Sequence, residues 1–335
     1  MDVDEGVAAS VAYLSSAAAM DCLAASAYWP KWDSPWWHML LLHEMGETRR
    51  IPERAVGAFV DALNAMPVKI FPIHEDEVPA GIDPYNDTAC HCQLGNVYRV
   101  LDAWGLDVDA ALPWVGPWFV RYQMADGGLN CDEAAYLVAD ECPSSMVGTI
   151  AAFEAMAMRS RGDLNAAEAG FVDRAAGFMA GRRLTMGSAT RHNAAERVAA
   201  AGWMLPCFPR FYHYDVLRGL TALSVWAERR GVGLARDVVA PVVAAMDEAF
   251  PDGVVRIGRS CWAGHGTIVR SGDGWDHRRQ AAVGFGLLEA VSEVGAVSPY
   301  LTREWAGTRR RVVGVMGWGW VGRLVAMGVD RGRWS

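Results

Sequence analysis

Apolar residues recur along this chain with the three- and four-residue spacing of α-helices, and no long stretch alternates apolar and polar residues as a strand would. The pattern predicts helices over residues 36–45, 53–66, 86–104, 109–124, 142–160, 164–181, 192–203, 212–230, 236–250, 277–295 and 299–313. With the N-terminal helices added, the expected number is about twelve. We therefore expect an all-α protein with a single domain over residues 1–335.

Proline and glycine mark the ends of these helices. Pro35 and Pro52 suit first helical positions, because proline lacks the N–H that has no partner there. Glycine can end a helix with a positive φ, and glycines follow the predicted helices at 105, 127, 128, 162, 231 and 295. Two irregular stretches separate helices: 67–84, which we expect to be a loop over one mouth of the fold, and 251–276, which is suited to a lid.

One stretch carries more information than the helical rhythm. Residues 118–132 read Trp-Phe-Val-Arg-Tyr-Gln-Met-Ala-Asp-Gly-Gly-Leu-Asn-Cys-Asp, and Ser144-Ser145 then precede a second apolar helix. An aromatic helix end, a Gly-Gly turn and a hydroxyl cap resemble one repeat of the squalene cyclase and protein prenyltransferase superfamily. The resemblance implies an (α/α)6 toroid, in which six helical hairpins close around an apolar cavity.

A second stretch carries a related resemblance. Residues 208–220 read Phe-Pro-Arg-Phe-Tyr-His-Tyr-Asp-Val-Leu-Arg-Gly-Leu. This segment resembles one found in bacterial squalene-cyclase-like proteins. The two stretches together cover residues 115–230, and the flanks fit only by their helical rhythm.

The composition limits the class of partner. The chain is 52% apolar and 21% charged, and its 15 tryptophans predict aromatic layers and an aromatic lining for a cavity that holds an apolar or cationic guest. A net charge of −8 argues against nucleic acid as a partner. Seven cysteines, without a basic signal-peptide region at the N-terminus, favour reduced thiols in the cytoplasm.

An apolar run at 312–329 bears on the question of membranes. Arg323 interrupts it, and glycines occur at 314, 317, 319, 322 and 328. A spanning helix normally has about 20 apolar residues and no central charge, so we expect a last buried helix and no transmembrane span. Contact with a membrane surface and burial in a homodimer interface are the alternatives.

The resemblance also implies a metal. Protein prenyltransferases hold one zinc ion with an Asp-x-Cys pair and a later histidine, and Asp140, Cys142 and His213 match these positions. Cys131 matches the wider bacterial group better than Cys142 does. The candidate zinc ligands are therefore Cys131, Asp140, Cys142 and His213, with one position open for catalysis. In the alternative interpretation, Asp140 is a solvated cap and Cys142 a small core residue.

Cys90, His91 and Cys92 form the densest group of potential ligands in the sequence. Adjacent helical residues point about 100° apart, so these three side chains cannot all face one ion. We expect His91 to reach the cavity as a catalytic candidate, beside two buried thiols. His38, which follows two tryptophans on an apolar helix face, is either a further catalytic candidate or a hydrogen-bonded core histidine.

Three segments with acidic residues offer acid–base chemistry. Asp107-Val-Asp109 departs from the Asp-x-Asp-Asp motif of class II terpene cyclases, and Asp109 suits a helix N-cap. His213 and Asp215 are a candidate catalytic pair, because a nearby carboxylate raises the pKa of an imidazole. Asp276-His277 lies in the glycine-rich stretch and is placed to close over a site.

The leading hypothesis is an enzyme that binds an apolar or partly apolar small molecule in a Trp-lined cavity. Zinc would assist group transfer, cyclisation or elimination there. Two alternatives stay open: a metal-free lyase or isomerase that uses His/Asp pairs, and a ligand-binding toroid with no catalytic role.

Overall fold

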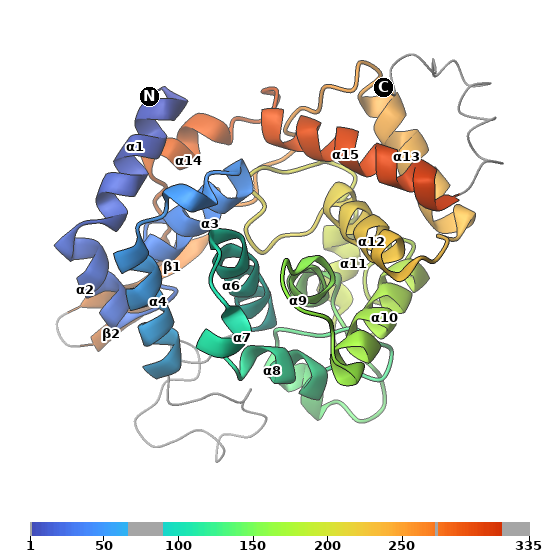
Figure 1. The fold of residues 1–335 in the computed structure, drawn as a ribbon, viewed down its shortest axis with the longest axis horizontal. Helices are drawn as coiled ribbons and strands as arrows, with labels where there is room; N and C mark the ends of the chain where they lie inside the picture. Colours follow the sequence, from blue (N-terminus) through green and yellow to red (C-terminus); the bar gives the residue numbers. More distant parts are fainter. Residues whose placement is uncertain (1, 66–89, 272–273, 317–335) are drawn as a thin grey trace.

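The computed structural model describes residues 2–65, 90–271 and 274–316, which fold mostly into α-helices (Figure 1). The chain begins with α1 (Val3–Leu14), α2 (Ala17–Ala25), α3 (Pro35–Met45) and α4 (Glu53–Ala65). The middle contains α6 (His91–Trp104), α7 (Val108–Ala111), α8 (Val115–Arg121), α9 (Met146–Met158), α10 (Ala166–Gly181), α11 (Ala194–Ala200), α12 (Val216–Arg230) and α13 (Arg236–Ala249). It continues with β1 (Gly266–Ser271), β2 (Gly274–Ala281), α14 (Gly286–Val291) and α15 (Pro299–Met316). Within the described ranges there are fourteen α-helices and one two-stranded sheet, which confirms the all-α prediction.

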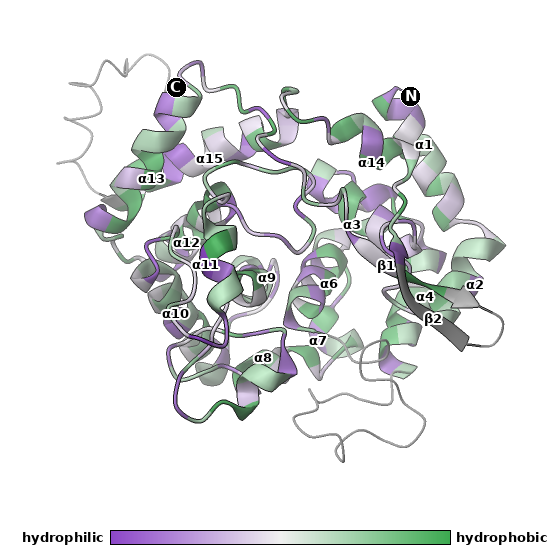
Figure 2. Cartoon of the chain, turned by 180° about the vertical axis from the view of Figure 1, so that it is seen from behind, coloured by the Kyte–Doolittle hydropathy of each residue, from purple (hydrophilic) through white to green (hydrophobic). Residues whose placement is uncertain are grey.

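Helix α9 lies in the middle of the molecule, with α6, α10 and α12 packed against it (Figure 1). Apart from Glu154 and Thr149 it is made of apolar residues and glycine, and almost every residue from Met146 to Ala157 is buried, as expected of a helix without a solvent face. Helix α12 packs in turn against α15. Helices at the periphery carry hydrophilic residues on one side, as α13 does in Figure 2.

The contact between α6 and α9 depends on Gly95. A Cβ at this position would lie 2.2 Å from the carbonyl carbon of Ala151 and 2.4 Å from its oxygen. No side chain fits at such distances, so only glycine lets the two helices approach this closely. The contact fixes the first turn of α6, which carries Cys92.

Most predicted helix ends are confirmed. Gly105 and Gly231 end α6 and α12 in the left-handed conformation. Ser145 caps α9 by accepting a hydrogen bond of 3.1 Å from the N–H of Gly148. Pro35 occupies the start of α3. The turn chemistry of glycine, serine and proline was therefore readable from the sequence.

Two predictions are wrong, one of a helix and one of a helix cap. The helix expected over 277–295 is instead strand β2, paired antiparallel with β1, followed by the short α14. The β-branched residues Thr267, Ile268 and Val269 favour a strand, and pairing with it overrides the local helical rhythm of β2. The cap of α7 is Asp107, not Asp109: its carboxylate accepts from Ala110 N at 3.1 Å.

Other predictions concern parts that the structure does not test. The expected loop at 67–84 lies outside the described residues, as does most of the apolar run at 312–329. The closed toroid stays a prediction, because the described helices range from four to 18 residues and do not form a regular series of hairpins. Among the described residues, no single helix is long and apolar enough to cross a membrane; α1 and α2 pass that test only together, across a bend of 66°.

Candidate metal centre

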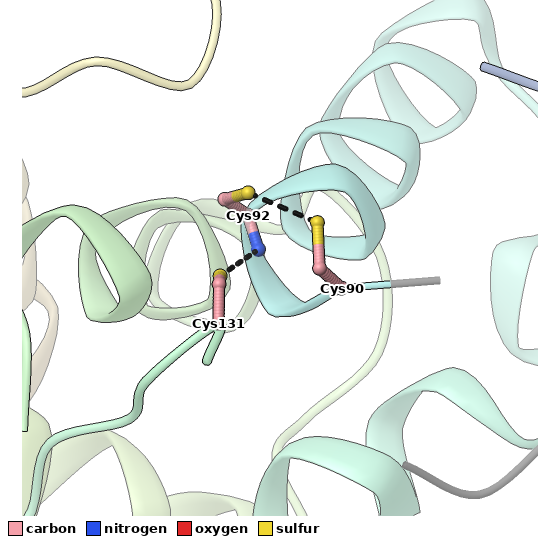
Figure 3. Close-up of side chains that lie close together, drawn as sticks. All are labelled: Cys90, Cys92 and Cys131. Atoms are coloured by element: carbon pink, nitrogen blue, oxygen red, sulfur yellow. Dashed lines mark hydrogen bonds between the residues drawn. The ribbon is translucent and has the colours of Figure 1, made fainter. Parts of the chain in front are cut away.

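Three cysteine side chains meet at the start of α6 (Figure 3). Cys90 precedes the helix as its N-cap residue, with extended backbone angles of φ −101° and ψ 161°. The 100° helical spacing therefore does not apply to it, and its sulfur lies 3.1 Å from that of Cys92. The two thiols therefore come together although they flank His91, and the expectation that His91 is the catalytic candidate of this segment stays a prediction.

Cys131 reaches the same point from the loop before α9. Leu129 N donates to Thr149 at 2.8 Å, and the amide of Asn130 donates to the carbonyl of Pro143 at 2.6 Å, so the loop is tied to the helix that follows. The N–H of Cys92 then donates to the Cys131 sulfur at 3.4 Å. The three sulfurs of Cys90, Cys92 and Cys131, called the thiol cluster below, lie within 4.8 Å of one another.

The thiols of the cluster differ in acidity. Hydrogen bonds from Cys131 and Cys92 hold the pKa of Cys90 well below its usual value. Hydrogen bonding to Cys90 and Cys92, together with burial, raises the pKa of Cys131. Cys90 is consequently the first of the three to become a thiolate, and the others are stabilised as thiolates only when a positive ion joins them.

The donor set fits a soft metal ion. Zinc binds cysteine thiolates at about 2.3 Å in a tetrahedron, which puts neighbouring sulfurs about 3.8 Å apart. The three sulfurs are already near that spacing, and soft thiolates select zinc or Cu(I) over Mg²⁺ or Ca²⁺. Across the described ranges, no other group of three Cys, His, Asp or Glu side chains brings its ligand atoms this close together.

His91 points into the core and not into the thiol cluster. It is fully buried, and Trp118 Nε1 donates to its Nδ1 at 2.7 Å. Because indole can only donate, Nδ1 is the acceptor and Nε2 carries the proton, which is donated to Tyr136 Oη at 3.0 Å. Burial lowers the pKa of His91 to about 3, so this imidazole is neutral and satisfied at both nitrogens.

His213 lies on the loop before α12, next to Tyr212. Their rings stack at 4.4 Å, and the thiols of the cluster are close enough to Tyr212 that their charges, together with burial, raise its pKa. Nε2 of His213 is buried and has no hydrogen-bond partner among the described residues. Burial and the nearby positive charge of His265 lower the pKa of His213 to about 3.

Buried charges hold this loop in place. Both oxygens of Glu44 accept backbone N–H groups of the loop, from Arg210 at 2.7 Å and Phe211 at 2.6 Å. Arg218 donates to the carbonyls of Phe211 at 3.0 Å and His213 at 2.8 Å. The amide of Asn96 donates to the carbonyls of Cys92 at 3.0 Å and Phe211 at 3.1 Å, so it ties the loop to the first turn of α6.

Asp215 is a structural partner of the backbone rather than of His213. It is fully buried and caps α12 by accepting from Arg218 N at 2.8 Å. It also accepts from Cys207 N at 3.0 Å and Arg210 Nε at 2.8 Å. Burial opposes its ionisation, but Arg210 and these hydrogen bonds outweigh that effect and lower its pKa. The expected His213–Asp215 pair is not formed.

Asp140 and Cys142 are not members of the thiol cluster. Asp140 is exposed and forms an ion pair with the exposed Arg191. The Cys142 sulfur lies 3.7 Å from the hydroxyl of Ser144. Of the four predicted ligands, Cys131 lies in the group that could hold a metal ion, and Asp140, Cys142 and His213 do not.

The remaining candidate residues from the sequence are His38 and the pair Asp276 and His277. His38 is buried, with Nδ1 3.1 Å from the Ser10 hydroxyl and its ring stacked 3.6 Å from that of Phe285. One ring nitrogen of His38 is thus hydrogen-bonded, whereas its Nε2 lies 3.7 Å from a carboxylate oxygen of Asp33 and has no hydrogen-bond partner among the described residues. Asp276 and His277 lie on β2, and their side chains fall outside the described part of the protein.

Lys31 is a site residue that the sequence analysis missed. Its ammonium lies 3.0 Å from Tyr212 Oη and 4.7–5.5 Å from the centres of four aromatic rings, those of Tyr28, Trp29, Trp32 and Tyr212. Its charge also acts on Cys92 of the cluster. A signal was present: the chain has 31 basic residues, of which only Lys31 and Lys69 are lysines.

Comparison with known proteins identifies no relative of this chain. The chain matches no family model, no curated protein and no solved structure. The resemblance to squalene-cyclase-like proteins therefore stays a prediction, and the thiol cluster is interpreted from its own geometry.

Proposed function

We propose that this protein is a zinc enzyme in which Cys90, Cys92 and Cys131 bind the metal and one ligand position is left to the substrate. The observation that carries the proposal is the convergence of three thiols within 4.8 Å, drawn from two separate segments of the chain. Three protein ligands with an open fourth position are typical of catalytic zinc, whereas structural zinc usually has four. When bound, the metal supplies a lowered pKa for a substrate thiol or water at that position.

The residues around the cluster support an apolar or partly apolar substrate. Trp32 is buried, and its ring stacks on those of Phe211 and Tyr212 at 5.1 and 5.8 Å. Such rings bind apolar groups through large contact areas. His213, neutral at physiological pH and with Nε2 uncommitted, is the acid–base candidate. Group transfer, cyclisation and elimination are the reaction classes proposed, and the closed toroid of the squalene-cyclase-like proteins belongs to the same proposal.

Metal analysis of the purified, reduced protein tests the proposal. We expect about one zinc ion per chain, lost in Cys131→Ser and retained in the matched control Cys142→Ser, whose thiol lies outside the cluster. Cobalt substitution adds a spectroscopic measurement, because tetrahedral thiolate-bound Co²⁺ absorbs strongly in the visible range. A metal-free protein with Cys90 and Cys92 joined as a disulfide would contradict the proposal, and so would zinc that survives Cys131→Ser.

The variant His213→Ala tests whether His213 takes part in the reaction without being a zinc ligand. Since His213 lies outside the ligand group, the variant is expected to keep its zinc and its cobalt spectrum. Turnover of a substrate found by screening should fall at least about 100-fold, the usual contribution of a positioned acid or base. Full activity in a zinc-loaded His213→Ala protein would remove this residue from the mechanism.

A further inference from the structure

Two further cysteines lie together on segments that run side by side. Cys207 and Arg259 face each other in an isolated parallel β-bridge, and Gly258 N donates to the carbonyl of Pro206 at 2.7 Å. Residues two apart in an extended backbone lie on the same face, so Cys261 lies on the side of Arg259. The Cys207 thiol is within hydrogen-bonding reach of the Cys261 thiol. Both cysteines are buried, and neither belongs to the thiol cluster.

The two thiols of this pair have different neighbours. Arg259 Nη1 donates to the Cys261 sulfur at 3.0 Å, whereas the Cys207 sulfur donates to a carboxylate oxygen of Asp215 at 3.7 Å. Burial, the hydrogen bond to Cys261 and the charge of Asp215 raise the pKa of Cys207. The thiolate is the nucleophilic form of cysteine, and a positive neighbour favours it. Cys261 is therefore placed to react first, while Cys207 keeps its proton beside it.

Access to the pair limits the size of an oxidant. Cys261 is 3% exposed and Cys207 is fully buried. Ala263 and Gly264, which closely follow Cys261, are exposed, so solvent comes near its sulfur. Hydrogen peroxide is little larger than water, whereas oxidised glutathione is a peptide disulfide that needs an open surface around the sulfur that it meets. The burial of the pair therefore favours a peroxide.

We infer that Cys207 and Cys261 are a site of reversible oxidation by hydrogen peroxide. The Cys261 thiolate attacks one peroxide oxygen and the O–O bond breaks, which leaves a sulfenic acid and a hydroxide that takes up the proton lost by the thiol. The Cys207 sulfur then attacks the Cys261 sulfur: the S–S bond forms, the S–O bond breaks, and water leaves with the Cys207 proton. Two thiols have been oxidised to a disulfide and one peroxide reduced to two waters. A thiol reductant reverses the change by exchange.

Peptide mapping of the full-length protein after treatment with hydrogen peroxide tests this site. Trypsin cuts after arginine, so the two cysteines fall in separate peptides, 198–210 and 260–270, each with a single cysteine. We expect a linked peptide, lighter by two hydrogens than the two together, that disappears on treatment with dithiothreitol. The control Cys142→Ser, at a thiol outside both groups, should give the same linked peptide. Oxidised glutathione should form it at least about tenfold more slowly than peroxide, because access limits the reaction.

Variants test which thiol reacts first. In Cys207→Ser, Cys261 should be trapped as its sulfenic acid by dimedone, because the second thiol is absent; in Cys261→Ser, Cys207 should stay unlabelled. Arg259→Met should slow formation of the linked peptide by at least about tenfold, and Arg259→Lys should restore part of the rate, since it keeps a positive charge near the sulfur. Thermal unfolding shows whether each variant is folded, and the mapping of the wild-type protein depends on none of them.

Several outcomes overturn this assignment. Peroxide-treated wild-type protein in which Cys207 and Cys261 stay unlinked would do so, whatever links form among the other cysteines. Label on Cys207 in Cys261→Ser, or an unchanged rate in Arg259→Met, would contradict the role given to Cys261. The site needs neither zinc nor the thiol cluster, so Cys131→Ser should still form the linked peptide. Failure of the zinc proposal is thereby distinguished from failure of this one.

Discussion

His91 is buried and His213 is half-buried, and the pKa of each imidazole is lowered to about 3, yet their surroundings differ in one respect. His91 has a hydrogen bond at each nitrogen, from Trp118 and to Tyr136. His213 has a buried Nε2 without a partner in the described structure. Burial and a shifted pKa therefore do not by themselves separate a structural histidine from a functional one. What distinguishes the two histidines is whether each ring nitrogen already has a hydrogen-bond partner.

The largest expected effect is that of His91→Phe on stability. The substitution removes the hydrogen bond from the buried indole N–H of Trp118 and the hydrogen bond to Tyr136, and each loss costs about 1–3 kcal/mol. We expect the free energy of unfolding to fall by about 2–5 kcal/mol, as measured by urea titration. A loss below about 1 kcal/mol would show that the two hydrogen bonds contribute little to stability. His91 would then not be a structural residue in the sense that distinguishes it from His213.

An intermediate effect is expected in acid. The folded-state pKa of His213, about 3, lies below its ordinary value near 6.5, so between these limits the unfolded chain takes up a proton that the folded chain does not. Stability therefore falls as pH decreases through this window, by about 1.4 kcal/mol per pH unit from this group. Urea titrations at pH 6 and pH 4.5 should show a weaker pH dependence in His213→Phe than in the wild type. The same slope in both proteins would place the His213 pKa near its ordinary value.

The smallest expected effect is that of His213→Phe on stability at pH 7. The substitution removes an unsatisfied nitrogen and keeps a flat ring against Tyr212, so the free energy of unfolding should change by about 1 kcal/mol or less. The control is His91→Phe in the same buffer. A loss for His213→Phe as large as that for His91→Phe would mean that His213 is also a structural residue.

The sequence predicted the helices because their signals are local. Apolar spacing, glycine at 105 and 231 and serine at 145 each act within one or two turns of the helix that they define. Strand β2 was not predicted, because its conformation depends on pairing with β1 and not on its own spacing. The all-α class was therefore predictable, and the hairpin was not.

The site was only partly predictable for a similar reason. Cys131 was predicted as a ligand and lies in a group of sulfurs that could hold a metal ion, but Cys90 and Cys92 were not predicted as its partners, because helical geometry was applied to Cys90, which lies one residue before the helix. The contacts of Lys31 with Tyr212 join segments 181 residues apart, which no local spacing reveals. The scarcity of lysine was the one signal in the sequence that pointed to it.

The hydrogen bonds of the Glu44 carboxylate bear on the order in which contacts form while the chain is synthesised. This carboxylate accepts a hydrogen bond from the backbone N–H of Arg210, which lies 166 positions later in the chain. By contrast, Cys92 and Cys131 are only 39 positions apart. Synthesis proceeds from the N-terminus, and contacts between distant residues are slow to form. All three thiols have therefore left the ribosome well before the loop that carries Tyr212 and His213. The three thiols can therefore come together in the nascent chain before the Glu44 and Arg218 contacts with this loop form.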